Sequence, residues 1–306
     1  MVVVCGGEGV WWRKLGGGEG NLGGWKCVYS REKKIVMSKR YDVVLSIAGS
    51  DPSGGAGIQA DIKAISAMGC YAATAITSVV NENTQGVYGV HDVPVEFVVG
   101  QICSVLDDLN VGAVKIGMLH SAELVRAVAG VLREKGVGNV VLDPVMVATS
   151  GGDLMMREAV EVVKSELAPL STVITPNIPE AEALLGGRKI GGVEDMKEAA
   201  SELTDLGTSV LLKGGHLEGD VMIDVLCNVG TMERLELPSD RVRTRNTHGT
   251  GCTLSSAIAA GLARGRGLTS AVIAAKEYMN GAIAAGAEYE IGKGHGPVCH
   301  FYRMLE

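Results

Sequence analysis

From Tyr41 onward, short runs rich in β-branched residues alternate with amphipathic stretches, and no other feature constrains the fold as strongly. The alternation is typical of βαβ units, in which helices cover a mostly parallel central sheet. We expect strands at 42–48, 72–80, 113–116, 139–143, 172–175 and 209–213. We expect helices near 57–69, 94–109, 121–135, 153–168, 179–185 and 193–206. Beyond these, 222–228 and 232–237 indicate an antiparallel edge pair, and helices follow at roughly 251–264 and 268–288.

The composition supports an α/β protein with a large core. Hydrophobic residues make up 46% of the 306 residues, aromatic residues only 4%, and there are 43 glycines. Small residues suit close-packed layers of helices and strands joined by tight turns. We therefore expect one α/β domain over 41–306.

The first residues of the chain differ from the rest. Residues 1–36 combine Gly-rich stretches with all three tryptophans and show neither helical nor strand periodicity. Met37 precedes the first convincing strand, so we predict that Met37 is the natural start. Residues 1–40 are then a disordered or spurious extension.

Charge and cysteine content exclude several classes of function. The formal net charge is −7 and we find no cluster of Lys and Arg, which argues against nucleic-acid binding and against an anionic membrane surface. Seven cysteines without a Cys-x-x-Cys pair indicate neither a disulfide framework nor a zinc site. A reducing cytoplasm fits best, and no apolar run approaches the roughly 20 residues of a membrane span.

The segment from Asn246 to Cys252 has the features of an anion-binding site. Its glycines allow close ligand approach, and the apolar spacing beyond them predicts that a helix begins at about Gly251. Free N–H groups at a helix start attract phosphate, and the helix dipole there favours the thiolate form of Cys252. The segment therefore suits phosphoryl transfer. The alternative is a Gly-rich loop before a core helix, with an inert buried cysteine.

A second Gly-rich loop, 49–57, follows the first strand of the α/β region. It is either a tight turn or a site of close ligand approach, and it is not a Walker A sequence. In the helix that follows, Asp61 lies beside the apolar stripe. A buried carboxylate needs a partner, so Asp61 is either salt-bridged or directed at a polar ligand.

Polar residues follow three later strands. Asp143 ends an apolar run and either faces the site or caps a turn before proline. Asn177 and Glu180 have helix-cap spacing, but Glu180 could instead hold Mg²⁺ through water. Lys213, followed by two glycines, suits a nucleotide phosphate. Three histidines lack zinc spacing and are expected to be hydrogen-bonding loop residues: His216, His248 and His295.

Six motifs together resemble the bacterial hydroxymethylpyrimidine kinase/phosphomethylpyrimidine kinase family of thiamine biosynthesis, within the ribokinase superfamily. They are GSDPSGGAGIQAD at 49–61, KIGML at 115–119, LDPVM at 142–146, TPNIPEAE at 175–182, LKGGH at 212–216 and NTHGTGC at 246–252. The resemblance covers about 41–302. It implies a ribokinase-like three-layer α/β/α sandwich whose mostly parallel central sheet has an antiparallel edge.

The resemblance also implies an activity and a set of site residues. The activity is ATP-dependent phosphorylation of 4-amino-5-hydroxymethyl-2-methylpyrimidine, then of its monophosphate to the diphosphate. The pyrimidine pocket would be lined by Gly49, Ala56, Asp61, Val80, Met118 and Val145. ATP and Mg²⁺ would be bound by Lys213, Asp143, Asn177, Glu180, Thr247 and His248. The backbone of Gly249, Thr250, Gly251 and Cys252 would form the anion hole, with Cys252 as a modest base. A homodimer is implied as well.

One position departs from the family pattern. Where many members have Gln before Asn-Thr, this chain has Glu82. An ionised Glu82 can accept a hydrogen bond from the 4-amino group, but it cannot donate one to a ring nitrogen unless it is protonated. Alternatively, Glu82 turns to solvent and Asn81 or Asn83 takes its place.

Three other functions are alternatives to this one. A pyridoxine or pyridoxal kinase shares the superfamily site and phosphorylates a similar hydroxymethyl group. A non-catalytic pyrimidine sensor would not need the phosphate-side residues. A dinucleotide-binding dehydrogenase is disfavoured, because Gly55-Ala56-Gly57 lacks the full fingerprint.

Overall fold

The computed structural model describes residues 10–14, 25–29, 40–146 and 155–305. The chain divides into two units, Met1–Arg40 and Tyr41–Glu306. In the first, β1 (Val10–Lys14) pairs antiparallel with β2 (Trp25–Tyr29). These two segments form strands although their sequence lacks strand periodicity, and the prediction that residues 1–40 are an extension to the domain stays a prediction. Alternation arises where one face of a strand is buried, and a two-stranded ribbon does not require it. The predicted start at Met37 lies outside the described residues and stays a prediction.

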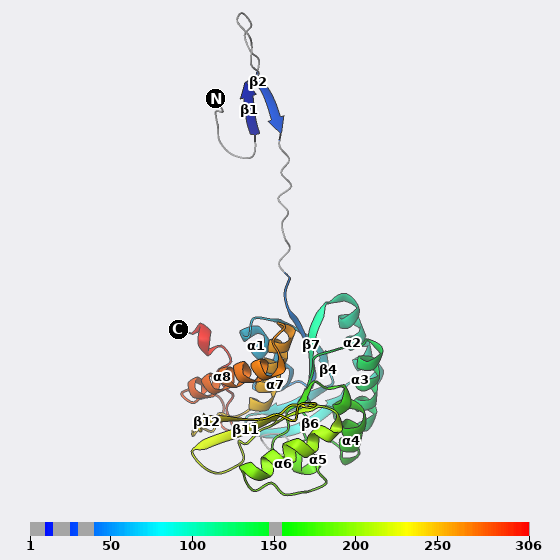
Figure 1. The fold of residues 1–306 in the computed structure, drawn as a ribbon, viewed down its shortest axis with the longest axis vertical. Helices are drawn as coiled ribbons and strands as arrows, with labels where there is room; N and C mark the ends of the chain where they lie inside the picture. Colours follow the sequence, from blue (N-terminus) through cyan, green and yellow to red (C-terminus); the bar gives the residue numbers. More distant parts are fainter. Residues whose placement is uncertain (1–9, 15–24, 30–39, 147–154, 306) are drawn as a thin grey trace, which may run out of the picture. The chain divides into compact units, whose positions relative to one another are not determined.

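The second unit is built on an eight-stranded sheet of order β12-β11-β10-β9-β8-β7-β3-β4 (Figure 1). Neighbouring strands from β4 to β10 run parallel, and β11 and β12 form the antiparallel edge that we expected. The strands are β3 (Val43–Ala48), β4 (Tyr71–Ile76), β7 (Val111–Ile116), β8 (Val140–Leu142), β9 (Val173–Ile174), β10 (Ser209–Leu212), β11 (Val221–Cys227) and β12 (Arg234–Asp240).

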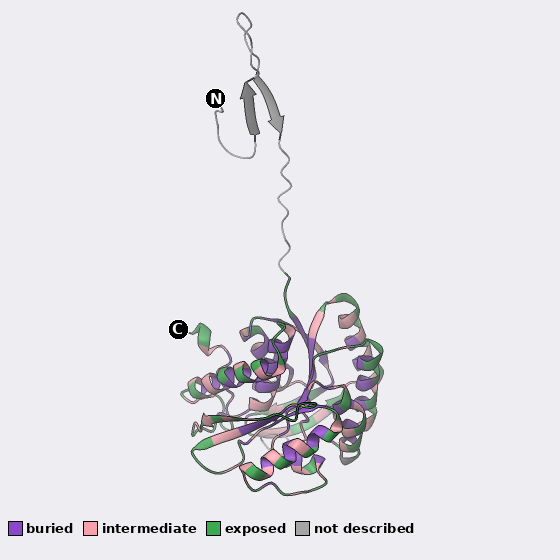
Figure 2. Ribbon diagram, in the orientation of Figure 1, coloured by how far each residue is buried: buried purple, intermediate pink, exposed green. Residues whose placement is uncertain are grey.

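Helices cover both faces of this sheet, and its central strands are buried, whereas the edge strand β12 has no buried residue (Figure 2). On one face lie α1 (Gly57–Ala67), α7 (Thr250–Ala263) and α8 (Leu268–Gly286). On the other lie α2 (Val95–Asp108), α3 (Ala122–Glu134), α4 (Arg157–Val162), α5 (Ile178–Leu184) and α6 (Val193–Leu203). Along β3, Val44 packs toward the first group and Leu45 toward the second, as the pleat of a strand requires. The predicted three-layer α/β/α fold is confirmed.

The predicted strand 72–80 is in fact two strands in different sheets. β4 ends at Ile76, and β5 (Ser78–Asn83) pairs with β6 (Gly86–Asp92) in a separate hairpin. Between them, the Thr77 hydroxyl donates to the Met118 carbonyl at 3.0 Å. This long-range contact fixes the point where the chain leaves the main sheet, and the local pattern of residues carries no sign of it.

Two other predicted elements have different bounds. The helix expected over 153–168 starts as α4, becomes π-helical over Val163–Leu167 and ends as a 3-10 turn over Ala168–Leu170. Pro169 has no N–H to continue the helix, and residues 153 and 154 lie outside the described residues. The second edge strand begins at Arg234 and not at Met232, whose φ of 53° belongs to a turn. No helix in the described part of the chain is long and apolar enough to cross a membrane.

Candidate active site

One cavity of about 850 Å³ lies beyond the carboxyl ends of the parallel strands, where ligands collect in open α/β sheets. With the exception of Asp61, every residue predicted for the site lines this cavity. They are Gly49, Ala56, Val80, Glu82, Met118, Asp143, Val145, Asn177, Glu180, Lys213, Thr247, His248, Gly249, Thr250, Gly251 and Cys252. The fold therefore joins segments that are far apart in sequence.

The predicted anion hole is a helix N-terminus that opens into this cavity. Helix α7 starts at Thr250, close to the expected position, and Gly249 precedes it with a φ of 75°. A Cβ at Gly249 would lie 1.8 Å from the Gly55 carbonyl oxygen, so only glycine fits. A Cβ at Gly251 would lie 3.2 Å from Asp143 Oδ2 and 3.3 Å from Lys213 Nζ. The start of the helix therefore faces a Lys–Asp pair, and a phosphate bound there would meet both partial and full positive charge.

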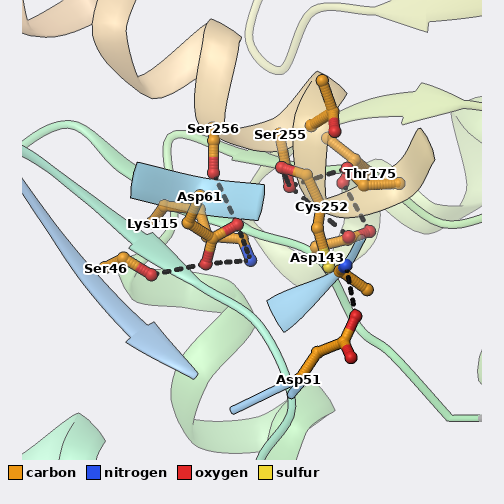
Figure 3. A network of polar contacts seen from close by, with 12 residues as sticks. Ser46, Asp51, Asp61, Lys115, Asp143, Thr175, Cys252, Ser255 and Ser256 are labelled. Carbon is orange, nitrogen blue, oxygen red and sulfur yellow. Dashed lines mark hydrogen bonds and ion pairs between the residues drawn. The ribbon is translucent and has the colours of Figure 1, made fainter. Parts of the chain in front are cut away.

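Asp143 is the anchor of that pair. Its Oδ1 accepts hydrogen bonds from Lys213 Nζ at 2.9 Å and from the Thr175 hydroxyl at 3.0 Å (Figure 3). Asp143 is 1% exposed. Burial alone would raise the pKa of Asp143, but the charges of Lys213 and Lys115 and these hydrogen bonds lower it. The carboxylate is ionised and holds the Lys213 ammonium in the cavity.

Asn177 and Glu180 were expected either to cap a helix or to hold Mg²⁺, and the structure gives evidence on both. The Asn177 side chain accepts from the Glu180 N–H, and Glu180 Oε2 accepts from the Asn177 N–H at 2.7 Å, which is a complete capping box for α5. The capping interpretation is confirmed. Glu180 Oε2 also lies 3.9 Å from Lys213 Nζ. Burial raises the pKa of Glu180 to about 7 against the effect of Lys213, so a second cation nearby would favour its ionised form.

Asp61 lies outside the cavity, in a buried network (Figure 3). Lys115 Nζ lies 2.8 Å from both carboxylate oxygens, and the hydroxyls of Ser46 and Ser256 donate to the same group at 2.5 and 2.8 Å. All of its acceptor sites are used within the protein. The salt-bridge alternative is confirmed, and the prediction that Asp61 lines the pyrimidine pocket was wrong.

Cys252 occupies the predicted place in the first turn of α7, but its predicted ionisation was wrong. Burial raises the pKa of the Cys252 thiol to about 11, and the positive charge of Lys115 only partly offsets this. The negative charges of Asp61 and Asp143 add to the rise. The helix dipole is therefore outweighed by burial and two nearby acids.

The Gly-rich loop 49–57 is organised around Asp51, which the sequence did not single out. Asp51 Oδ2 accepts from the N–H groups of Gly55 and Ala56 at 2.9 and 2.6 Å. His248 Nε2 lies 2.9 Å from the same oxygen, so His248 is the hydrogen-bonding loop residue that we expected. Burial alone would raise the pKa of Asp51, but the His248 contact, the Ser53 side chain and the Ala56 N–H outweigh burial and lower that pKa to about 2. A Cβ at Gly55 would lie 2.4 Å from His248 Cδ2, so the two loops touch.

Glu82 lies beside this pair on the wall of the cavity, so the alternative in which it turns fully to solvent is wrong. Partial burial and the charge of Asp51 raise its pKa to about 7, against the effect of His248. Ligand atoms of Asp51, Glu82 and His248 all lie within 4.8 Å of one another, a spacing that could suit a metal ion. However, Asp51 Oδ2 is already occupied by four hydrogen bonds, so we interpret this group as a hydrogen-bonded cluster.

The apolar residues predicted for the pyrimidine pocket line the cavity around the start of the same loop. The Val80 N–H donates to the Ser50 hydroxyl at 3.1 Å, which ties β5 to the loop. A Cβ at Gly49 would lie 2.8 Å from Ser78 Oγ and 3.5 Å from Met118 Sδ. The close packing leaves the backbone of Gly49 as part of the cavity surface.

A buried ion pair that sequence reasoning missed lies at the other end of the cavity. Lys276 Nζ on α8 lies 2.6 Å from Asp224 Oδ2 on β11, and Asp224 Oδ1 accepts from the Gly214 N–H at 2.8 Å. A signal was present in the sequence. Lys276 shares a helix face with Val272 and Met279, and Asp224 interrupts an apolar strand. A charge in an apolar stripe indicates a buried partner.

Comparisons with known proteins agree with this geometry. The family model described as phosphomethylpyrimidine kinase matches residues 51–299. A hydroxymethylpyrimidine/phosphomethylpyrimidine kinase of Rhizobium meliloti is 51% identical over 263 residues, which cover 85% of this chain and 97% of that protein. The solved phosphomethylpyrimidine kinase of Clostridium difficile is 42% identical, with a TM-score of 0.69 over 79% of this chain and 99% of its own.

A pyridoxal kinase is also similar. The Bacillus subtilis enzyme, solved as an ADP complex, is 36% identical, with a TM-score of 0.79 over 87% of this chain and 100% of its own. The structure is therefore similar both to a pyridoxal kinase and to a phosphomethylpyrimidine kinase. The family model and the Rhizobium meliloti relative indicate the phosphomethylpyrimidine kinases. On the extent of that match, the chain is a kinase that belongs to the phosphomethylpyrimidine kinase family.

Proposed function

We propose that this protein transfers the γ-phosphoryl group of ATP to 4-amino-5-hydroxymethyl-2-methylpyrimidine, and then phosphorylates the monophosphate, in thiamine biosynthesis. One observation carries the proposal. The apolar wall with Glu82 and the phosphate-binding start of α7 with Lys213 belong to one cavity. A hydroxymethyl group held at the wall would point toward the transferred phosphoryl group.

The chain's own residues supply positioning and charge. The Lys213 ammonium, held by Asp143, neutralises phosphate charge, and the N–H groups at the start of α7 are fixed before any ligand arrives. Phosphoryl transfer has a loose transition state, so such fixed donors account for most of the catalysis.

The residues around Lys213 fit a magnesium ion. Asp143 and Glu180 offer carboxylate oxygens, which are the ligands that Mg²⁺ prefers. Burial and the charge of Asp143 raise the pKa of Glu180 to about 7 against the effect of Lys213, and a cation bound there would lower it. We propose that these two carboxylates hold Mg²⁺, with Asn177 beside them. When bound, the ion would neutralise charge on the β- and γ-phosphates.

Cys252 lies next to the anion hole on the acceptor side, and we propose that it contacts the hydroxymethyl group. With a pKa of about 11 it is a neutral thiol at pH 7, so a base role depends on the small thiolate fraction. A loose transition state makes little demand on a base, because the acceptor proton leaves late.

The direct test is product analysis with the pyrimidine, ATP and Mg²⁺, following the mono- and diphosphate separately. We expect both products, and Lys213→Met should abolish both while the protein stays folded. If the protein binds the pyrimidine but forms no product, it is the non-catalytic sensor considered as an alternative. Because a pyridoxal kinase is a structural relative, pyridoxal is assayed in parallel. A higher kcat/KM for pyridoxal would overturn the proposal.

We also propose a homodimer in the cytoplasm. The β5–β6 hairpin stands outside the main sheet, and its Val79 and Tyr88 are 54% and 62% exposed. A two-stranded hairpin is marginal alone, so a second copy packed on it would stabilise it. Sedimentation velocity tests this: a monomer at micromolar concentration contradicts the dimer. The free thiols of the described residues fit a reducing compartment.

A further inference from the structure

A Gly-rich segment near the end of the kinase domain contacts two segments that lead into opposite walls of the cavity. We call residues 286–297 the C-terminal strap. It begins at Gly286, the last residue of α8, and contains three glycines in alternation, Gly292, Gly294 and Gly296. Such a composition would suit a flexible linker. The contacts of this segment instead fix it at two places.

At one place the strap holds the tip of the β5–β6 hairpin. The Gly294 N–H donates to the Thr84 hydroxyl at 3.1 Å, and the His295 N–H donates to the Thr84 carbonyl at 2.8 Å. Thr84 is buried in the turn between β5 and β6, two residues beyond Glu82. The position of the pyrimidine-side wall therefore depends on the strap.

At the other place the strap holds the loop that leads into α7. The Asn246 side-chain amide donates to the carbonyls of Gly286 and Tyr289 at 2.8 and 2.7 Å. The His248 N–H donates to the Gly296 carbonyl at 3.0 Å. His248 directly precedes the first residue of the anion hole. One segment thus binds the backbone on both sides of the reaction centre.

The glycines of the strap are required by these contacts. A Cβ at Gly294 would lie 1.8 Å from the Thr84 carbonyl oxygen, and a Cβ at Gly292 would lie 2.4 Å from Thr84 Oγ1. A Cβ at Gly296 would lie 2.2 Å from Asn246 Oδ1. Real Cβ atoms do not approach other atoms so closely. The backbone of the strap lies directly against Thr84 and Asn246, and any side chain at these positions would push it away.

We propose that the C-terminal strap is a positioning element that keeps the pyrimidine-side hairpin in register with the phosphate-binding loop, with Thr84 and Asn246 as its anchors. Neither anchor lines the cavity, so each acts through the segments that it holds. Transfer requires the acceptor oxygen and the phosphoryl group at near-contact distance, and a displacement of about 1 Å costs on the order of a hundredfold in rate. The kinetic part of this inference rests on the proposed function.

The first test compares Thr84→Val with Thr84→Ser. Valine keeps the shape of threonine but removes the acceptor for Gly294, whereas serine keeps the hydroxyl. We expect kcat/KM for the pyrimidine to fall about tenfold or more in the valine variant, with the KM for ATP unchanged, because one wall moves and the nucleotide end does not. The serine variant should behave like the parent. If valine and serine variants are both like the parent, or if both substrates are affected equally, the inference is wrong.

The second test does not depend on the substrate. Gly294→Ala introduces the clash with Thr84, and Gly130→Ala is its control, because a Cβ at exposed Gly130 would meet nothing within 4 Å. Amide hydrogen exchange is measured on both full-length variants. We expect Gly294→Ala to speed exchange in β5–β6 and also in 246–252, which it does not touch, while Gly130→Ala changes neither. Faster exchange in the hairpin alone, or in neither segment, would overturn the coupling.

The two tests separate the failure of the strap from the failure of the proposed function. If the parent does not phosphorylate the pyrimidine, the proposed function fails and the exchange experiment still decides whether the strap couples the two walls. If the parent is active and exchange changes only at the site of mutation, the proposed role of the strap is wrong and the proposed function stands.

Discussion

At the scale of single residues, Glu82 is a titratable side chain on the cavity wall that we propose binds the pyrimidine. A glutamine at this place offers one donor and one acceptor at every pH, whereas Glu82 offers both only when protonated. Its pKa of about 7 places that change in the physiological range, and the charged groups that face it are Asp51 and His248. We therefore expect hydrogen bonding at this part of the cavity to depend on pH, which a glutamine would not cause.

The first prediction concerns this response. The pKa of Glu82 is raised from 4.5 to about 7, so the carboxyl is protonated below pH 7 and loses its proton as the pH rises through that value. If the protonated form binds the pyrimidine, the KM should rise about tenfold between pH 6 and pH 8. Glu82→Gln should make the KM independent of pH in this range. Initial rates across the range check this, and a KM that falls with pH would contradict it.

The second prediction concerns Cys252. Because its pKa is raised to about 11, the thiolate fraction grows about tenfold for each pH unit up to that value. If the thiolate assists transfer, kcat of the parent should increase with pH between 7 and 10. Cys252→Ala should lower kcat, leave the KM for the pyrimidine unchanged and remove the increase. An unchanged kcat in the alanine variant would exclude Cys252 as a base.

The residue types of the site could be predicted from the sequence, but their ionisation could not. Lys213 and Asp143 were found because each follows a strand that ends at the same edge of a parallel sheet. The pKa of Cys252 depends on burial and on the distance to Asp61, which no local pattern contains. The sequence around Asp61 agreed equally with a salt bridge and with a ligand contact, and only the fold shows that Lys115 lies beside it.

At the scale of elements, the buried pair between Lys276 on α8 and Asp224 on β11 makes the third prediction. Lys276→Met keeps the aliphatic stem but leaves Asp224 buried without its cation. Removing one partner of such a pair costs about 3–5 kcal/mol, which should lower the midpoint of urea-induced unfolding clearly. Arg188→Met is the matched control, because Arg188 pairs with Glu198 and Glu202 at the surface and little change is expected. Equal effects of the two variants would contradict the prediction.

Elements with a strong local pattern were predictable, and those set by distant contacts were not. Helix α7 was placed from glycines followed by apolar residues at helical spacing. The break between β4 and β5 depends on the Thr77 contact with Met118, forty-one positions away in the chain. The hairpin that it releases, β5–β6, carries Val80 and Glu82. The element that sequence reasoning described least well is therefore the one that carries the cavity residues Val80 and Glu82.

At the scale of the whole molecule, the fourth prediction concerns the first unit. Every cavity residue and all of the matched family region fall after Arg40. A chain that begins at Met37 should therefore show the same urea midpoint and the same kcat as the full chain. Parallel unfolding curves and assays check this. A loss of stability or activity in the shorter chain would mean that the first unit contributes to the kinase domain.

The contact between Gly55, His248 and Pro297 has a consequence for how the protein is made. A Cβ at Gly55 would lie 2.4 Å from His248 Cδ2 and 3.1 Å from Pro297 Cβ, so residues near both ends of the domain meet at one point. The ribosome releases Gly55 long before it releases Pro297. Contacts between such distant residues also form late in folding, because a long loop must close first. During synthesis the strand ends with Asp143 and Lys213 are thus complete well before the walls that enclose them. A translation product that stops short of the strap would carry these residues in an open, unfinished cavity.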